Sequence, residues 1–256
     1  MLQDVKSYLG KCFAMKDLGE AAYILGIKIY RDRLRRLIGL CQSAYIKKIL
    51  KRFFMENSKR GSIPMQEKLK LCKSQGSSTP VEVKRMQNIP YASAVGSIMY
   101  VMRCTRPNVA FAHNITSLFQ QNPGELHWTS IKNILKYLRN TKDMFLVYED
   151  ASKKAIWVRK FIFRLGIVPT IKEPIKMYCE NTEAITIANE SGITKGARHY
   201  RAKVHYLRKV IEFGDIKLEK VHTDDNLADP FTKALPYLKH SEHTKNIRMF
   251  PANILM

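Results

Sequence analysis

Residues 178–185 read Tyr178-Cys179-Glu180-Asn181-Thr182-Glu183-Ala184-Ile185, and a predicted strand changes to a predicted helix within this stretch. Apolar side chains alternate over residues 175–179, which is typical of a short strand. Residues 183–188 then have the spacing of a helix start. The order strand, acidic residue, helix indicates a fold in which strands and helices alternate, and it places Glu180 at the end of a strand.

A second acidic stretch lies downstream and reads Thr223-Asp224-Asp225-Asn226-Leu227-Ala228-Asp229-Pro230-Phe231-Thr232-Lys233. We expect a strand over 216–221 before it and a closing helix over 226–235. Together the two stretches resemble the last two acidic motifs of the RNase H domain of copia-type LTR retrotransposon polyproteins. The resemblance implies that Glu180 and Asp229 stand at two of four positions whose carboxylates hold two Mg²⁺ ions.

The resemblance also shows what the chain lacks. The family has Asp where this chain has Glu180, and its two earlier carboxylates have no counterpart here. Full-length relatives carry three strands and the start of a helix after Val147-Tyr148, whereas this chain continues almost at once with the later part of that helix, over 151–165. The simplest interpretation is an internal deletion that leaves a metal site too incomplete for catalysis, because Mg²⁺ demands strict geometry.

The first sixty residues predict a hairpin and an amphipathic helix. The stretch 18–30 has a turn followed by β-branched residues, as in a hairpin. From Ser43, a candidate N-cap, apolar residues recur at helical spacing. They are Ile46, Ile49, Leu50, Phe53 and Phe54. The opposite side carries only positive charge, from Lys47, Lys48, Lys51 and Arg52. Because no acidic residue pairs with them along the helix, we interpret this face as a phosphate-binding surface.

A polar segment over 57–90, interrupted by prolines, predicts a loop or linker. Pro107 suits a first helical position. A longer helix is expected after Pro123-Gly124, with a core face made by Trp128, Ile131, Leu135 and Leu138. Lys132, Lys136 and Arg139 lie beside that core face and form a second basic surface.

These segments resemble copia-type reverse transcriptase downstream of its catalytic palm. The hairpin resembles the primer-grip region, residues 42–50 resemble the start of the thumb, and residues 90–112 match the block that joins polymerase to RNase H. The Tyr-Val-Asp-Asp turn that holds the polymerase metals is absent from the sequence. The resemblance therefore implies that this chain adds no nucleotides by itself.

Charge points to a polyanionic partner. The chain has 44 Lys and Arg against 22 Asp and Glu, a net charge of +22, which exceeds what solubility requires. A third basic surface is expected on the helix that includes Arg198 and Arg208. Five cysteines without a CxxC pair argue against a disulfide framework and a zinc site, and His240 and His243 are expected at the surface. No signal peptide or long apolar run is present, which favours a cytoplasmic or nuclear protein without a membrane partner.

The sequence thus predicts an α+β or α/β fold, in which a helical thumb and connection segment of a reverse transcriptase precedes a partial RNase H-like fold. The expected domains are 1–148, the C-terminal part of reverse transcriptase; 151–236, a truncated RNase H-like domain; and 237–256, a C-terminal tail. The expected function is that of an inactive polyprotein fragment whose partners are RNA, DNA or their hybrid and other Pol domains. Two alternatives stay open: a nucleic-acid-binding module, and a residual metal-dependent nuclease that uses Glu180 and Asp229.

Overall fold

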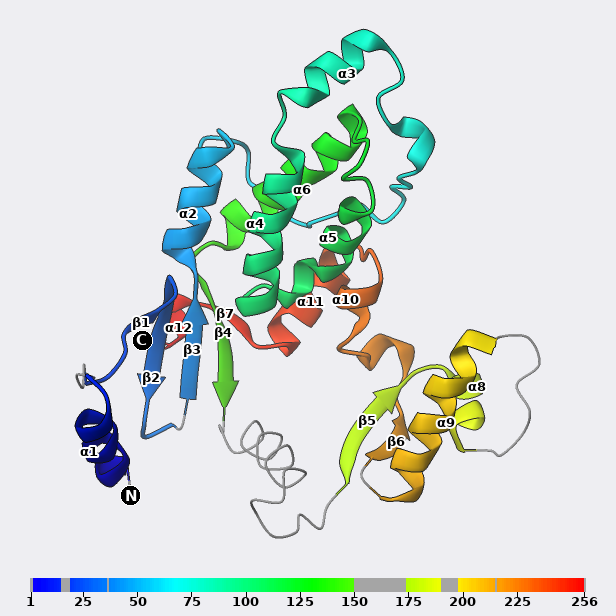
Figure 1. Ribbon diagram of the computed structural model, residues 1–256. Coiled ribbons are helices and arrows are strands. Elements are labelled where there is room, and N and C mark those ends of the chain that lie inside the picture. Colours follow the sequence, from blue (N-terminus) through cyan, green and yellow to red (C-terminus); the bar gives the residue numbers. More distant parts are fainter. Residues whose placement is uncertain are drawn as a thin grey trace. The chain divides into compact units, whose positions relative to one another are not determined.

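The structure, a computed structural model, describes residues 2–14, 19–35, 37–149, 174–189, 198–214 and 216–255. It divides into two compact units, of which the first comprises residues 1–150 and 230–256 and the second comprises 151–229. The second unit is therefore an insertion in the chain of the first. Both contain helices and strands, so the fold is mixed α and β (Figure 1). The helix expected over 151–165 lies outside the described residues.

An antiparallel sheet forms one part of the first unit, in the order β1-β2-β3-β4-β7. Its strands are β1 (Tyr23–Ile24), β2 (Ile27–Asp32), β3 (Leu37–Cys41), β4 (Met144–Glu149) and β7 (Met249–Pro251). The predicted hairpin is confirmed as β1 and β2. Its turn places Leu25 and Gly26 at φ of 50° and 77°, the left-handed pair that tight hairpins favour.

Helices form the rest of the first unit and most of its core. They are α1 (Leu2–Cys12), α2 (Ser43–Arg52), α3 (Pro80–Gln87), α4 (Tyr91–Cys104), α5 (Ala110–Ser117), α6 (Glu125–Thr141), α11 (Tyr237–Asn246) and α12 (Ala252–Leu255). Short 3₁₀ helices span Lys73–Gln75 and Pro107–Val109. The apolar faces of α2, α4 and α6 meet in one cluster, where Ile46, Ile98 and Leu135 are fully buried. The core faces predicted for α2 and α6 are confirmed, except at Phe54.

Two details of helix α2 differ from the prediction. Its N-cap is Gln42 rather than Ser43, and no side chain bonds the free N–H groups there. Phe54 is 92% exposed instead of buried. The helix ends at Arg52, and Phe54 has a φ of 55°. This left-handed turn ends the helical spacing on which the prediction depended.

The segment predicted as a loop, 57–90, contains helix α3. Pro80 occupies its first turn and Thr79 its N-cap, where the hydroxyl accepts from the Glu82 N–H at 3.3 Å. The Glu82 carboxylate accepts from the Thr79 N–H at 3.1 Å in return, which completes a capping box. Pro80 therefore starts a helix here rather than interrupting one.

Arg106 joins helix α6 to strand β4. Its side chain is fully buried, and its guanidinium donates to the carbonyl oxygens of Thr105 (2.9 Å), Thr141 (2.5 Å) and Met144 (2.9 Å). The last carbonyls of a helix lack internal partners and carry partial negative charge. Arg106 therefore supplies both hydrogen bonds and positive charge where α6 ends.

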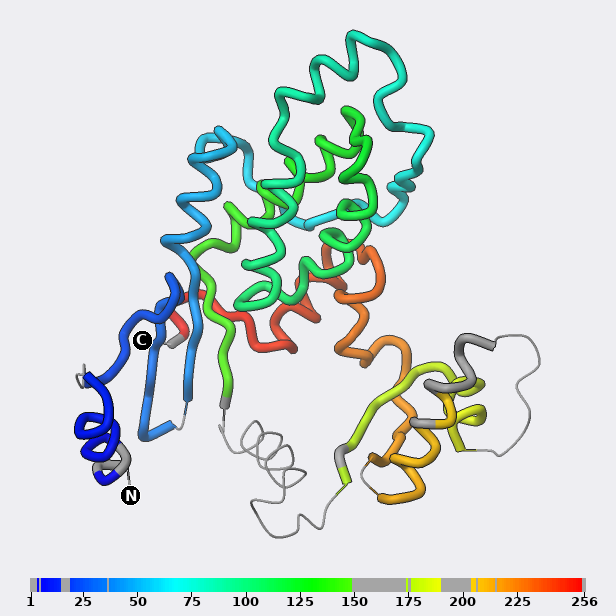
Figure 2. Tube along the Cα trace, viewed as in Figure 1, coloured from blue at the N-terminus to red at the C-terminus, as the bar shows by residue number. Residues whose placement is uncertain are grey.

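The C-terminal residues, set apart as a tail on sequence grounds, pack within the first unit. Strand β7 pairs with β4, with Phe250 opposite Phe145, and Figure 2 traces this part of the chain. His240 and His243, expected at the surface, are only 4% and 1% exposed. The expectation was wrong because α11 packs on the rest of the unit: the Asn108 amide donates to the Thr244 hydroxyl at 3.1 Å.

The second unit follows the predicted order of strand, helix, helix and strand. Its elements are β5 (Ile175–Cys179), α8 (Thr182–Asn189), α9 (Arg198–Glu212), β6 (Ile216–Lys220) and a 3₁₀ helix, Thr223–Asp225. Helix α10 (Asp229–Thr232) begins with the last residue of this unit and continues into the chain of the first. Strands β5 and β6 pair in parallel. The predicted closing helix over 226–235 is thus shortened to the four residues of α10, and Asp229 is the last residue of this unit.

Candidate nucleic-acid interface

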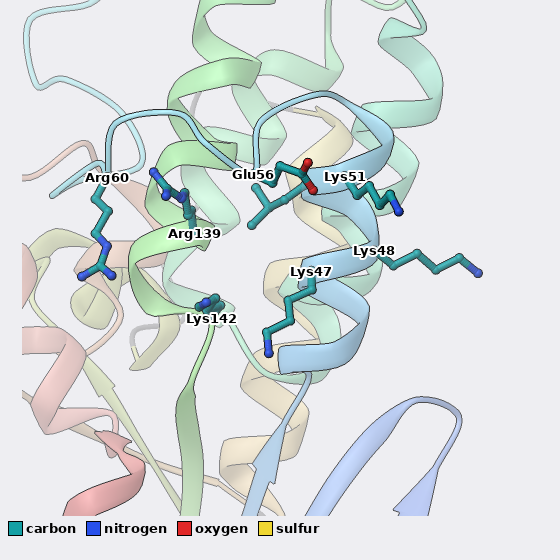
Figure 3. A pocket seen from close by; sticks show the side chains of 8 residues that line it. Lys47, Lys48, Lys51, Glu56, Arg60, Arg139 and Lys142 are labelled. Atoms are coloured by element: carbon teal, nitrogen blue, oxygen red, sulfur yellow. The ribbon is translucent and has the colours of Figure 1, made fainter.

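A basic hollow of about 490 Å³ lies in the first unit, between helices α2 and α6. Three segments line it (Figure 3). Helix α2 provides Lys47, Lys48, Leu50 and Lys51, the segment after α2 provides Glu56 and Arg60, and the end of α6 provides Arg139 and Lys142. The hollow therefore unites the two basic surfaces that the sequence predicted separately, and it adds two cations to them.

Packing of the apolar faces fixes the walls of the hollow. Ile49 and Leu50 of α2 and Leu138 of α6 belong to the same buried cluster, so the basic faces of both helices turn to the same side. The segment between them is held by Gly61, whose N–H donates to the Lys136 carbonyl at 3.0 Å. A Cβ on Gly61 would come within 3.0 Å of the Tyr137 backbone nitrogen. Only glycine lets the two backbones come this close without moving apart. The close contact places Arg60 beside α6.

The hollow carries a large excess of positive charge. Six of its eight lining residues are Lys or Arg, and Glu56 is the one carboxylate among them. Within the described residues, Lys142 forms a salt bridge with Asp143 at 3.8 Å, and none joins Lys47, Arg60 or Arg139 to an acidic side chain. The described surface thus leaves these cations to an external anion, as phosphate contacts require.

Three predicted cations lie outside the lining of the hollow. The Arg52 guanidinium lies 5.7 Å from the centre of the Phe53 ring. Lys132 forms a salt bridge with Glu125 at 3.6 Å. Lys136 contributes its carbonyl to the Gly61 contact. Of the seven cations predicted on the two helices, four therefore line the hollow: Lys47, Lys48, Lys51 and Arg139.

The sequence prediction missed Arg60, Lys142 and Glu56. Arg60 was counted within a linker, and Lys142 follows the end of α6. The signal in the sequence was the pair Lys59-Arg60 directly before Gly61, since a glycine often marks a close backbone approach.

The basic residues of helix α9 belong to the second unit. Arg208 donates from Nε and Nη2 to the Ile187 carbonyl, at 3.0 and 2.7 Å. The two hydrogen bonds join the Arg208 guanidinium to a carbonyl in the last turn of α8, where carbonyls lack partners within the helix. The sequence did not predict this structural contact. Arg198 begins α9, and its side chain lies outside those that the structure describes.

The two acidic candidates also lie in the second unit. Glu180 follows β5 and Asp229 begins α10, and Asp229 is buried, at 1% exposed. The described residues contain no group of three or more His, Cys, Asp and Glu side chains that could hold a metal ion. Since a two-metal centre needs several carboxylates around both ions, the described residues do not fit one.

Comparison with known sequences places the chain among transposon proteins. The family described as reverse transcriptase (RNA-dependent DNA polymerase) matches residues 1–67, which include helix α2 and Arg60. A retrovirus-related Pol polyprotein from transposon TNT 1-94 of Nicotiana tabacum is 32% identical over 295 residues, covering 92% of this chain. The chain is a relative of copia-type transposon Pol polyproteins. A second Pol polyprotein, from transposon RE2 of Arabidopsis thaliana, is 23% identical and matches 96% of this Pol-related chain.

The Pol-related chain spans about a fifth of these relatives, 22% of the first and 20% of the second. A putative transposon Ty5-1 protein of Saccharomyces cerevisiae is 29% identical over 154 residues, covering 60% of this chain and 48% of that protein. No solved structure is significantly similar to the Pol-related chain. Among the described residues of this chain, no helix is both long and apolar enough to cross a membrane.

Proposed function

We propose that this chain is a fragment of a retrotransposon Pol polyprotein that retains nucleic-acid binding and has no catalytic activity of its own. Residues 1–148 correspond in this proposal to the primer-grip hairpin, thumb and connection of reverse transcriptase. Residues 151–236 correspond to a truncated RNase H-like domain. The match of the first 67 residues to reverse transcriptase supports the first assignment, and the two acidic motifs support the second.

The basic hollow is the observation that carries the binding function. Its cations come from residues 47 to 142, yet they surround one space with a single carboxylate. Backbone phosphates of RNA, DNA or their hybrid are the ligands that such a surface fits, and counterion release makes the affinity fall with salt. Other Pol domains are the proposed protein partners, because the relatives are several times longer than this chain.

The second half of the proposal is that the chain has lost catalytic activity. The 295-residue match to the tobacco relative involves only 92% of this 256-residue chain. The matched region is thus longer in the relative, as an internal deletion would leave it. This deletion, which would remove the family's two earlier carboxylates, supports a chain that holds no catalytic Mg²⁺ pair; within the described residues, no group of three or more possible metal ligands comes together. Nuclease assays with Mg²⁺ test it: we expect equal, background cleavage by wild type and Asp229→Asn, and cleavage lost in the variant would contradict the proposal.

Binding is tested by fluorescence anisotropy with a labelled RNA/DNA hybrid over a series of salt concentrations. Replacing Lys47 and Arg139 by Ala should weaken binding and reduce the slope of log K against log salt by about 2, one unit for each lost phosphate contact. The matched control replaces Lys84 and Arg85, two exposed cations of α3, and should keep the wild-type slope. No measurable binding by the wild type, or equal losses in both double variants, would refute the proposed interface.

A further inference from the structure

The cations around the hollow form two sets that point in different directions. In Figure 3 the Lys47 side chain extends from α2 into the gap toward α6, where Arg60, Arg139 and Lys142 lie. Lys48 and Lys51 extend to the outer side of α2, away from these residues. We call Lys47, Arg60, Arg139 and Lys142 the inner set. Its residues come from three separate segments of the chain. The inner set is therefore a cluster formed by tertiary packing, not a row of charges along one helix.

The inner set holds more positive charge than one internal phosphate can balance. Lys142 is partly neutralised by Asp143 at 3.8 Å, and Glu56 lies toward α2 in Figure 3 rather than among the inner cations. Each internal phosphodiester carries one negative charge. A terminal phosphate monoester carries about 1.5 to 2 at pH 7, and a terminal triphosphate carries more. Charge complementarity therefore favours a strand end over a strand interior.

The backbone around the hollow is arranged so that it does not repel an anion. The end of a helix carries partial negative charge, and α6 ends beside the hollow at Thr141. Arg106 covers this end: its Nη2 group donates to the Thr141 carbonyl at 2.5 Å and to the Lys142 carbonyl at 3.3 Å. The carbonyls of Thr141 and Lys142 are thus already bonded to a cation.

The lining also indicates which part of a nucleotide is recognised. It contains no aromatic side chain on which a base stacks and no Asn or Gln that reads a base edge. Arg60 and Arg139 offer planar guanidinium forks, which match phosphate oxygens. A volume of about 490 Å³ leaves room for a phosphate together with its sugar, and it is typical of small-ligand sites.

We propose that the hollow binds the phosphorylated end of a nucleic-acid strand, as a terminal phosphate monoester or polyphosphate, without regard to the base. The proposal rests on the proposed nucleic-acid binding and deepens it by naming the group that the hollow holds. Free polyphosphates carry the same phosphate group, so the experiment distinguishes a strand end from a free polyphosphate.

The experiment compares two labelled single strands of one sequence, one with a 5′-phosphate and one with a 5′-hydroxyl, on the full chain. We expect the phosphorylated strand to bind about fivefold more tightly, the effect of one further charge at a partly exposed site. The preference should increase between pH 5.5 and 7.5, because the second proton of a phosphate monoester leaves near pH 6. Repetition with a different base sequence should give the same ratio.

Matched variants locate the effect. Lys47→Ala should remove the preference for the 5′-phosphate, whereas Lys48→Ala, the same change one residue away on the same helix, should weaken both strands equally. Tripolyphosphate is the free source of the same group, and it should displace the phosphorylated strand at concentrations that leave the 5′-hydroxyl strand bound.

Two outcomes overturn the inference. Equal binding of both strands by the wild type, with a normal salt slope, removes the end-specific site but leaves the proposed function intact. A preference that survives Lys47→Ala and Arg139→Ala assigns the phosphate end to another surface. Failure of the wild type to bind either strand would instead contradict the proposed function itself.

Discussion

The N–H of Gly61 donates to the carbonyl oxygen of Lys136 at 3.0 Å, and this bond joins the segment after α2 to the middle of α6. An added Cβ would lie 3.0 to 3.2 Å from backbone and side-chain atoms of Tyr137 and Lys136. The contact brings Arg60 to the hollow, so a residue without a side chain determines where a side chain of the proposed interface lies.

Gly61→Ala should lower the free energy of unfolding by about 1–3 kcal/mol, because the methyl group has no space against α6. Urea denaturation measures it. Gly96→Ala is the matched control: Gly96 lies inside helix α4 with nothing within 4 Å of an added Cβ. That change should stabilise the protein by about 0.5–1 kcal/mol, through helix propensity. Equal effects of the two substitutions would contradict the close approach.

Arg106→Met should destabilise the first unit by about 3 kcal/mol, since several buried carbonyl oxygens lose their donor. The matched change Arg103→Met affects an exposed arginine near the end of α4, and it should shift stability by less than about 0.5 kcal/mol. Thermal melts of both variants distinguish them. If Arg106→Met melts like the wild type, the guanidinium is not what joins the end of α6 to β4.

Stability should fall as the pH drops below about 6.5. Burial lowers the pKa of His113, His127 and His240 from the ordinary value of 6.5, so the unfolded chain binds more protons than the folded one. The stabilisation is fully present above 6.5 and is lost as the pH falls through the lowered pKa values. Urea midpoints at pH 7.5 and 5.5 measure it.

Two variants identify the histidine responsible. His240→Gln should reduce the pH dependence, because the uncharged amide replaces a ring buried between Asn108 and Thr244. His205→Gln replaces an exposed histidine of α9 and should leave the dependence unchanged. Equal slopes in all three proteins would exclude His240 as the source of the pH dependence.

Helix α3 should fray in acid before its neighbours. Hydrogen bonds from the backbone N–H groups of Ser78 and Thr79 lower the pKa of Glu82 to about 2. The capping interaction is therefore present above about 4.5 and is lost as the pH falls toward 2. Amide hydrogen exchange in residues 80–87, with α6 as internal reference, checks this. Thr79→Ala should weaken the helix by about 1 kcal/mol at neutral pH, and unchanged exchange in this variant would refute the capping box.

Local patterns in the sequence predicted local structure well. The hairpin, the apolar faces of α2 and α6, and the strand and helix around Glu180 depend on spacing within one segment, and each is present in the structure. The basic faces of α2 and α6 were predicted for the same reason. That they share one hollow depends on tertiary packing between residues nearly a hundred positions apart, which no periodicity encodes.

The failures have physical causes of the same kind. His240 and His243 looked like surface residues because α11 has few apolar side chains, yet both are buried, and His240 and Thr244 form hydrogen bonds with Asn108. Arg60 was missed because its position depends on the Gly61 contact rather than on a helix. The tail was set apart because three residues of β7 carry no signal until β4 is beside them.

The pairing of β4 with β7 has a consequence for how the protein is made. Residues 144–149 leave the ribosome long before their partners at 249–251, and the whole second unit is synthesised in between. The edge of strand β4 therefore stays unpaired while the second unit is synthesised. Bringing β7 back to β4 closes a loop of about a hundred residues, which costs entropy. Unpaired edges of this kind attract other chains. The nascent protein is consequently most vulnerable to aggregation after β4 has emerged and before β7 arrives, so a chaperone that shields that edge should raise the yield of folded protein.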